Sequence, residues 1–263
     1  LFLGALQGAT EFLPISSSGH LVLVPWLLGW DSTGLFFGVS VHLGTLLAVL
    51  AYFRRDLWAM GLAWLDTLRS RRVETAYGRL AWLIILATVP AALAGALLED
   101  WFEGMFSAPL LVSLLLLVTG SLLFLSERVR SVGKRSEEVS VLDSVLVGIA
   151  QAAAIAPGIS RSGATMAAGL GRGLLRPEAA RFSFLLATPI VAGAGLLELV
   201  QWVGEGGSQE WGLVLIGGVS AALAGFAAIS TLIRYLRARS LRAFVYYCWA
   251  FGTLCLFLAL LRS

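Results

Sequence analysis

The chain has 263 residues, of which 58% are hydrophobic and only 13% are charged, and its formal net charge is +3. Soluble domains carry about 25% charged residues, so this composition excludes an ordinary soluble domain and predicts a multi-spanning membrane protein. Apolar segments run from end to end without a polar block large enough to fold alone, so we expect one domain over residues 1–263. We expect membrane lipids and no nucleic acid as partners.

The first 30 residues form an apolar stretch that is broken by "LPISSSGH" near its middle. The chain starts inside this stretch without Met, so we expect a few native residues to precede it, and we find no cleavable signal pattern. The pieces on either side of the break have about 12–16 residues, or roughly 18–24 Å of helix. Neither piece can cross a hydrocarbon core of about 30 Å. The stretch is therefore predicted to be a re-entrant helical hairpin, and so is 141–175, which is broken by "APGISRSGAT".

Six other segments are long and apolar enough to cross the membrane as helices. They are approximately 36–53, 80–98, 108–126, 182–203, 211–233 and 243–261. The last of these contains Cys248 and Cys255, whose spacing places them two helical turns apart, too far for a disulfide. We expect both cysteines to be packing residues.

The charges give this arrangement an orientation. All Lys and Arg residues except Arg161 and Arg262 fall within 54–79, 128–135, 172–181 and 234–242. Under the positive-inside rule, these four places are cytoplasmic. The connections between them carry acidic residues instead: Asp31, Glu99, Asp100, Glu103, Glu205 and Glu210. This orientation is consistent for the whole chain only if 141–175 enters the membrane and leaves it on the inside. For the same reason, 1–30 must enter and leave on the outside.

A shift of 144 residues reveals an internal repeat, which aligns Gly4 with Gly148, Gln7 with Gln151 and Ser16 with Ser160. Repeat one covers approximately 1–126 and repeat two approximately 141–263. Each copy is a hairpin followed by three spans, and an odd number of spans makes the copies inverted in the membrane. Inverted repeats with broken helices place their site near the midplane, where the breaks meet. The predicted fold is therefore an all-α polytopic membrane protein with six full spans and two facing re-entrant hairpins.

Both breaks are suited to bind an anion. A half-helix is expected to start at about Ser18 and another at about Ser162, and helix N-termini attract anions. Arg161 adds a bidentate donor that favours phosphate or diphosphate over carboxylate. Ser160 and Thr165 flank Arg161 and can donate to the anion or cap the second half-helix. The alternative is that Arg161 is only a structural partner of Glu11.

Glu11 is the only acid in the first hairpin, and Gln7 lies one helical turn before it. A carboxylate and an amide oxygen beside a phosphate site suit Mg²⁺ or Ca²⁺, with substrate oxygens completing the coordination. Alternatively, Glu11 only bonds a helix end or pairs with Arg161.

Ser17 and His20 are three residues apart, so a helical turn would bring them within reach as a nucleophile and a base, or His20 could activate water. Capping is the alternative role for the serines of this break, and Ser18 is the expected cap because its repeat mate is Ser162. His20 could also be a buried spacer bonded to a backbone carbonyl. We interpret His42, which lies inside a span, as structural.

The two motifs "QGATEFLPISSSGHL" (7–21) and "PGISRSGAT" (157–165) resemble the signature motifs of the undecaprenyl-diphosphate phosphatases, a family associated with bacitracin resistance. The resemblance extends along the whole chain. It implies hydrolysis of a polyprenyl diphosphate lipid to the monophosphate and inorganic phosphate at the external (periplasmic) face of the bacterial inner membrane, which recycles the carrier lipid for cell-wall synthesis. It also implies Ser17 as the proposed nucleophile, His20 as the acid or base, and phosphate binding at Ser160, Arg161 and Thr165. The hydroxyls of Ser16 and Ser162, at the starts of the two half-helices, are further candidates for phosphate binding. Where the family motif has Glu or Gln, this chain has Gln7, which leaves Glu11 as the only carboxylate for a metal.

A transporter is the chief alternative, because inverted repeats with broken helices are typical of secondary carriers. A lipid flippase is the form of this alternative that fits an anionic lipid. The presence of Ser17, His20 and Glu11 together favours a hydrolase, since a carrier has no need of a nucleophile. Whether the protein forms a homo-oligomer is left open by the sequence.

Overall fold

The computed structural model describes residues 1–30, 35–129, 133–204 and 211–262. Within these ranges the fold is all-helical, with one isolated parallel bridge between Lys134 and Leu174. The α-helices are α1 (Phe2–Phe12), α2 (Ser17–Leu28), α3 (Leu35–Tyr52), α4 (Arg54–Ser70), α5 (Ala76–Phe106), α6 (Pro109–Ser126), α7 (Val141–Ala153), α8 (Arg161–Gly171), α9 (Arg176–Gly204), α10 (Trp211–Leu236) and α11 (Arg242–Arg262). A 3₁₀ turn, η1 (Ser136–Glu138), precedes α7.

Five helical segments are each long and apolar enough to cross a membrane: Ala76–Leu98, Pro109–Ser126, Arg176–Leu197, Leu215–Leu236 and Arg242–Arg262. A sixth crossing arises if Phe37–Tyr52 and Arg54–Ser70, which are bent by 81° at a short break, count as one span. Large apolar side chains such as Leu47, Leu97 and Leu223 face outward from the helices, as expected for contact with lipid. The chain is therefore a multi-spanning membrane protein, and six full spans remain a prediction.

Helix α4 is an element that the sequence analysis missed, because it treated 54–79 as a basic connection. Met60 and Thr67 are buried on one side of α4, and Trp82 on α5 donates a hydrogen bond of 2.9 Å to the Thr67 hydroxyl. The Arg residues near both ends of this segment led the sequence analysis to treat it as a connection. Leu57, Met60 and Trp64 recur at helical spacing and form an apolar face that packs against the core and stabilises α4.

The two predicted hairpins are both present as pairs of short helices. Residues 13–16 separate α1 from α2, and residues 154–160 separate α7 from α8. Helix α2 begins at Ser17 and helix α8 at Arg161, one residue before the positions expected from the sequence.

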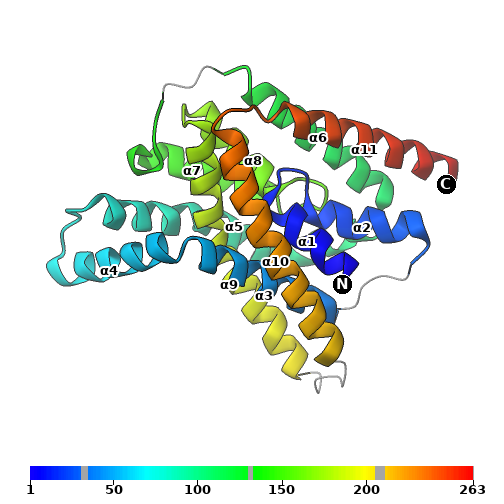
Figure 1. Ribbon diagram of the computed structural model, residues 1–263, viewed down its shortest axis with the longest axis horizontal. Coiled ribbons are helices and arrows are strands. Elements are labelled where there is room, and N and C mark those ends of the chain that lie inside the picture. Colours follow the sequence, from blue (N-terminus) through cyan, green and yellow to red (C-terminus); the bar gives the residue numbers. More distant parts are fainter. Residues whose placement is uncertain (31–34, 130–132, 205–210, 263) are drawn as a thin grey trace.

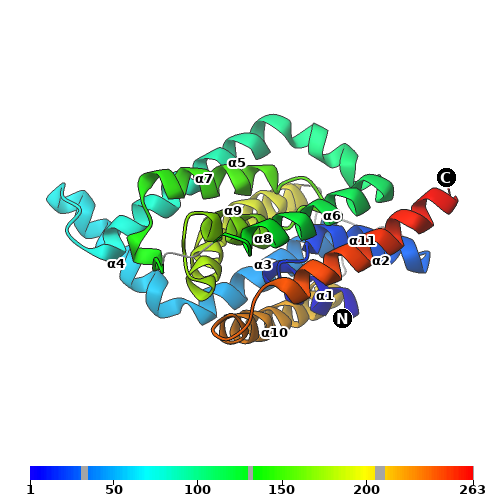
Figure 2. The same cartoon turned by 90° about the horizontal axis from the view of Figure 1, so that it is seen from above.

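Helices from the two halves of the chain pack against each other. A Cβ added to Gly8 of α1 would lie only 2.2 Å from the Ala221 carbonyl oxygen of α10, and a Cβ on Gly148 of α7 would lie 2.6 Å from the Ala87 carbonyl oxygen of α5. Only glycine permits backbones to approach this closely. Helices α6 and α11 also lie side by side, as Figures 1 and 2 show. The halves are therefore interlocked.

Two further expectations concern particular side chains. Cys248 and Cys255 are buried free thiols, which confirms that they are packing residues. Asp31, Glu205 and Glu210, which were expected to mark external connections, lie outside the described residues. The side chains of Glu99, Asp100 and Glu103 also lie outside the description.

Candidate active site

The two polar breaks meet inside the molecule. The Ser162 hydroxyl donates a hydrogen bond of 3.1 Å to the Leu13 carbonyl oxygen, which joins the second break to the first. Gly19 and Gly158 are so close that a Cβ on Gly19 would lie 3.2 Å from the Gly158 Cα. The sequence predicted that the hairpin tips come together, and this is confirmed.

Glu11 is the centre of the polar cluster between the breaks. Its carboxylate accepts a hydrogen bond of 2.5 Å from Arg161 Nη2 on one oxygen and of 2.5 Å from the Ser17 hydroxyl on the other. Gln7 Nε2 donates to the second oxygen as well, over 3.0 Å. These partners matter because the Glu11 side chain is only 8% exposed, and a buried carboxylate without compensation is costly. Four predicted site residues from three helices thus form one cluster.

Two atoms of this cluster are buried and lack a hydrogen-bond partner within the described part of the chain: Gln7 Oε1 and Arg161 Nη1. Buried polar groups are nearly always hydrogen-bonded, so atoms left open in this way indicate a position for a ligand. The open guanidinium nitrogen is a donor for an anion. The open amide oxygen is an acceptor for a cation or a ligand hydroxyl.

Each half-helix beyond a break begins at a serine cap. The Ser16 hydroxyl accepts a hydrogen bond of 3.2 Å from the N–H three residues later, and the Ser160 hydroxyl accepts the equivalent bond of 3.0 Å. The sequence analysis chose Ser18 as the cap because it matched Ser162, and this was wrong by two residues. Ser16 and Ser160 are themselves repeat mates, so the two caps are equivalent. The remaining first-turn N–H groups have no helical acceptor and suit an anion.

Side chains of α6 and α11 hold the breaks in place. Thr119 Oγ1 on α6 donates to the Gly158 carbonyl oxygen over 2.9 Å and accepts from the Ser160 N–H over 2.9 Å. On α11, the Cys248 thiol donates to the Pro14 carbonyl oxygen over 3.7 Å. Pro14 and Gly158 are aligned by the 144-residue shift, so α6 and α11 support corresponding points.

The predicted pairing of Ser17 with His20 is wrong. His20 Nδ1 lies 2.7 Å from the Ser16 carbonyl oxygen and therefore carries the hydrogen, so Nε2 accepts from the Tyr247 hydroxyl over 2.6 Å. The imidazole also stacks on the Tyr247 and Phe251 rings. The helix turn directs His20 toward α11, whereas it directs the Ser17 hydroxyl toward Glu11.

His20 also supports an unusual backbone conformation. Ser16 has a φ of 70°, in the left-handed region that residues other than glycine seldom adopt. The bond from His20 to the Ser16 carbonyl fixes this peptide beside the site. Strain of this kind persists only where the surroundings determine it, and it is concentrated at functional sites.

The other predicted phosphate-binding hydroxyls lie at the second break but already have partners. Thr165 Oγ1 donates to the Arg161 carbonyl oxygen over 2.7 Å and lies 2.7 Å from the Ser183 hydroxyl of α9. The Ser160 and Ser162 hydroxyls lie 3.1 Å apart. These groups therefore hold the first turn of α8, from which Arg161 projects.

Three residues at the site were missed or set aside by the sequence analysis. Tyr247 and Thr119 contact site residues from distant helices, and both are ordinary polar residues within apolar spans. His42 on α3, which we took to be structural, interacts electrostatically with Glu11. The sequence carries a signal only for His42, as a titratable residue inside a span.

The residues present offer limited support for a divalent cation. The described part of the chain contains no group of three or more His, Cys, Asp or Glu side chains that could hold a metal. Gln7 Oε1 and the Glu11 carboxylate are two oxygen donors of the type that Mg²⁺ and Ca²⁺ prefer. They fit a cation whose remaining ligands are substrate oxygens and water.

Comparison with known proteins identifies the family. The family described as bacitracin resistance protein BacA matches residues 1–254. This chain belongs to the bacitracin resistance protein family. Relatives in this family include a protein named undecaprenyl-diphosphatase from Thermomicrobium roseum, which is 47% identical and aligns over 95% of this chain and 93% of its own length.

Two other relatives with the same name support the assignment over the full length. The protein from Rubrobacter xylanophilus is 47% identical, with 99% of this chain and 97% of the relative aligned. The protein from Pelotomaculum thermopropionicum is 46% identical, with 100% of this chain and 97% of the relative aligned. Both hairpins therefore fall within the region shared with the family.

Proposed function

We propose that this protein is an undecaprenyl-diphosphatase, a membrane enzyme that hydrolyses undecaprenyl diphosphate to the monophosphate and inorganic phosphate. The names of its relatives give the reaction. The observation that carries the proposal in this chain is the buried cluster of Glu11, Ser17 and Arg161, in which Arg161 Nη1 is open to an anion.

In this proposal, the terminal phosphoryl group of the diphosphate binds at Arg161 and the N-termini of α2 and α8. Arg161 and the oriented N–H groups stabilise the charge of the transition state, which is the main contribution that proteins make to phosphoryl transfer. The open Nη1 allows Arg161 to bind phosphate without first losing its bond to Glu11.

Ser17 is the proposed nucleophile and Glu11 the proposed base. The Ser17 hydroxyl is bonded to the Glu11 carboxylate, which can take its proton as the oxygen attacks phosphorus. The bond between phosphorus and the bridging oxygen breaks, and undecaprenyl monophosphate leaves. Glu11 then releases this proton to the solvent. Water attacks the phosphoserine, and Glu11 accepts a proton from the water and returns it to the Ser17 oxygen as its bond to phosphorus breaks, which releases inorganic phosphate. Direct attack by water activated by Glu11 uses the same residues.

His20 is a positioning residue in this scheme. Its Nδ1–H is bonded to the Ser16 carbonyl, and its Nε2 accepts from the Tyr247 hydroxyl, so the neutral imidazole has no proton to give. Undecaprenyl monophosphate leaves as an anion and needs no proton at the moment of departure. His20 therefore acts by fixing Ser16 at the N-terminus of α2.

Mg²⁺ or Ca²⁺ is the proposed cofactor. Gln7 Oε1 and Glu11 would hold the ion together with the diphosphate oxygens. When bound, it supplies charge neutralisation of the phosphates.

The proposed topology is an inverted repeat of a re-entrant hairpin and three spans, in the bacterial inner membrane. It is supported by the concentration of Lys and Arg in four segments of the sequence, 54–79, 128–135, 172–181 and 234–242. The equivalent packing of α1 on α10 and α7 on α5 supports it as well. The site then opens to the periplasmic face, where the recycled carrier lipid is found.

The deciding experiment is phosphate release by the purified protein from undecaprenyl diphosphate in detergent, with and without a chelator. Release that stops with chelator and returns with Mg²⁺ or Ca²⁺ would support the enzyme and its cofactor. A carrier without hydrolytic activity would release no phosphate under any of these conditions. Release that chelator does not change would support the enzyme and reject the cofactor.

A further inference from the structure

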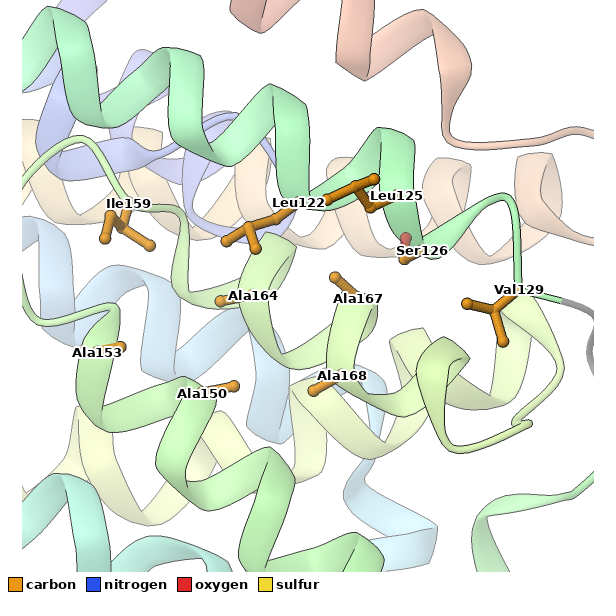
Figure 3. A pocket seen from close by; sticks show the side chains of 10 residues that line it. All are labelled: Leu122, Leu125, Ser126, Val129, Ala150, Ala153, Ile159, Ala164, Ala167 and Ala168. Carbon is orange, nitrogen blue, oxygen red and sulfur yellow. The ribbon is translucent and has the colours of Figure 1, made fainter.

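A pocket of about 380 Å³ lies directly beside the second break, between α6, α7 and α8 (Figure 3). We call it the alanine pocket. Five alanines from α7 and α8 face side chains from α6 and its C-terminal end, and only one of its ten lining residues is polar. Its lining residues are Ala150, Ala153, Ala164, Ala167, Ala168, Leu122, Leu125, Ser126, Val129 and Ile159.

The pocket begins at the candidate active site. Ile159 precedes the cap Ser160, and Ala164 follows Arg161 by three residues, on the neighbouring side of the same helical turn. The pocket then continues along α6 to Val129, as Figure 3 shows. Its size falls within the range of about 300–1,000 Å³ that is usual for small-molecule sites.

The equivalent space in the first hairpin is filled. The 144-residue shift aligns Ala164 with His20 and Ala167 with Leu23, and both mates are almost fully buried. Against His20, helix α11 places the Tyr247 and Phe251 rings. Among the described residues, the half that carries Arg161 leaves this space open, because it has Ala164 and Ala167 where the first half has His20 and Leu23.

We infer that the alanine pocket receives the first isoprene units of the substrate's polyprenyl tail, an inference that rests on the proposed function. A tail attached to a diphosphate at Arg161 must leave the site through an apolar opening. The alanine pocket is such an opening, continuous with the break, and the exposed side chains of Leu125 and Val129 border it at the lipid-facing end.

The direction of the pocket fits a lipid from the outer leaflet. Such a lipid holds its head toward the outside and its tail toward the inside. With the head at the breaks near mid-depth, the tail points into the inner half of the bilayer. In the proposed topology, the pocket runs from the break toward the basic cytoplasmic segment 128–135, which begins next to the lining residue Val129.

The pocket acts through shape. Lipid is as apolar as alanine, so the tail gains little hydrophobic free energy on leaving the bilayer for the pocket. A tail held beside α8 instead positions the attached diphosphate at Arg161, which raises reactivity by orientation. Large residues that fill the pocket should therefore weaken the use of long-tailed substrate while leaving binding of the head unchanged.

The test uses Ala153→Leu and Ala168→Leu, which fill the pocket from α7 and from α8. Ala153 is exposed and Ala168 half-buried, so neither change overpacks a closed core, and Ala227→Leu on the exposed side of α10 is the matched control. For each variant, kcat/KM for undecaprenyl diphosphate and the inhibition constant of a C5 prenyl diphosphate are measured by phosphate release.

We expect the two pocket variants to lower kcat/KM for the C55 substrate about tenfold, equivalent to about 1.4 kcal/mol, with an unchanged C5 inhibition constant. The control should change neither value. An unchanged kcat/KM, or an inhibition constant that rises by the same factor as kcat/KM falls, would overturn the inference. Absence of phosphate release by the wild-type protein would instead refute the proposed function.

Discussion

Glu11 accepts hydrogen bonds from the side chains of Arg161, Gln7 and Ser17. Within the described residues of the site, the Ser17 hydroxyl is the only hydroxyl bonded to a carboxylate. Glu11→Gln keeps the size of the side chain and removes its ability to accept a proton. Loss of a general base typically lowers turnover by about 10²–10⁴-fold, and we expect a fall in kcat of that size.

Phosphate release at saturating undecaprenyl diphosphate measures this fall. Glu127→Gln is the matched control, because Glu127 also pairs with an arginine, Arg176, but lies away from the breaks at the end of α6. Turnover by Glu11→Gln equal to that of the control would remove Glu11 from the proposed chemistry.

Gln151 has a buried side-chain amide without hydrogen bonds in the described part of the chain. Its side chain is 1% exposed, and neither its Nε2 nor its Oε1 has a partner among the described residues. A buried group left without a hydrogen bond costs about 1–3 kcal/mol. Gln151→Leu should therefore raise the melting temperature of the ligand-free protein in detergent.

Its repeat mate provides the contrast. Gln7 donates to Glu11, so Gln7→Leu should lower the melting temperature. A lower melting temperature for Gln151→Leu would show that the Gln151 amide is hydrogen-bonded in the folded protein.

The sequence predicted which side chains come together at the site, but not which of them form hydrogen bonds with one another. Arg161 and Glu11 were recognisable because charges inside apolar stretches are costly and need a partner. The hydrogen bond between Ser17 and Glu11 could not be recognised from the sequence. A spacing of three residues places Ser17 and His20 on one face of a helix, but it does not fix the direction in which each side chain points. The direction of His20 depends on Tyr247, which lies 227 positions later.

Helix α6 stabilises the second break through a single hydroxyl. Thr119→Val keeps the shape of the side chain but leaves the Gly158 carbonyl and the Ser160 N–H without a partner. We expect a loss of stability of about 1–3 kcal/mol for each orphaned group and reduced turnover, because Ser160 precedes Arg161.

The control for this change is Thr88→Val on α5, whose hydroxyl bonds only to a carbonyl of its own helix. Thermal unfolding and phosphate release are measured for both variants. Equal melting temperatures for the two would contradict the role assigned to Thr119.

Most elements could be predicted from apolar length and from Pro, Gly and Ser breaks, because a helix that spans lipid needs an uninterrupted apolar run. Helix α4 could not be predicted as a helix in this way, since few of its residues are buried and its ends are basic. The boundary of α2 moved by one residue because Ser16, Ser17 and Ser18 are all good caps. Ser16 is the cap in the structure because its hydroxyl accepts the Gly19 N–H, and the His20 ring holds its carbonyl.

For the whole molecule, the proposed orientation can be tested by labelling single cysteines in intact cells with a membrane-impermeant maleimide. Ser107→Cys, between α5 and α6, should react from outside, whereas Arg72→Cys, after α4, should react only after permeabilisation. Both positions are exposed, and the native Cys248 and Cys255 are fully buried, so background labelling should be low. Labelling of Arg72→Cys in intact cells would reject the topology.

The interlocking of the two halves has a consequence for how the catalytic centre is assembled. Glu11 and Ser17 belong to the first half and Arg161 to the second, while α1 packs on α10 and α7 on α5. If the gene is split between α6 and η1, neither fragment alone possesses a complete centre. Co-expression of the two fragments should restore catalysis by complementation, with a yield that depends on the amounts of both.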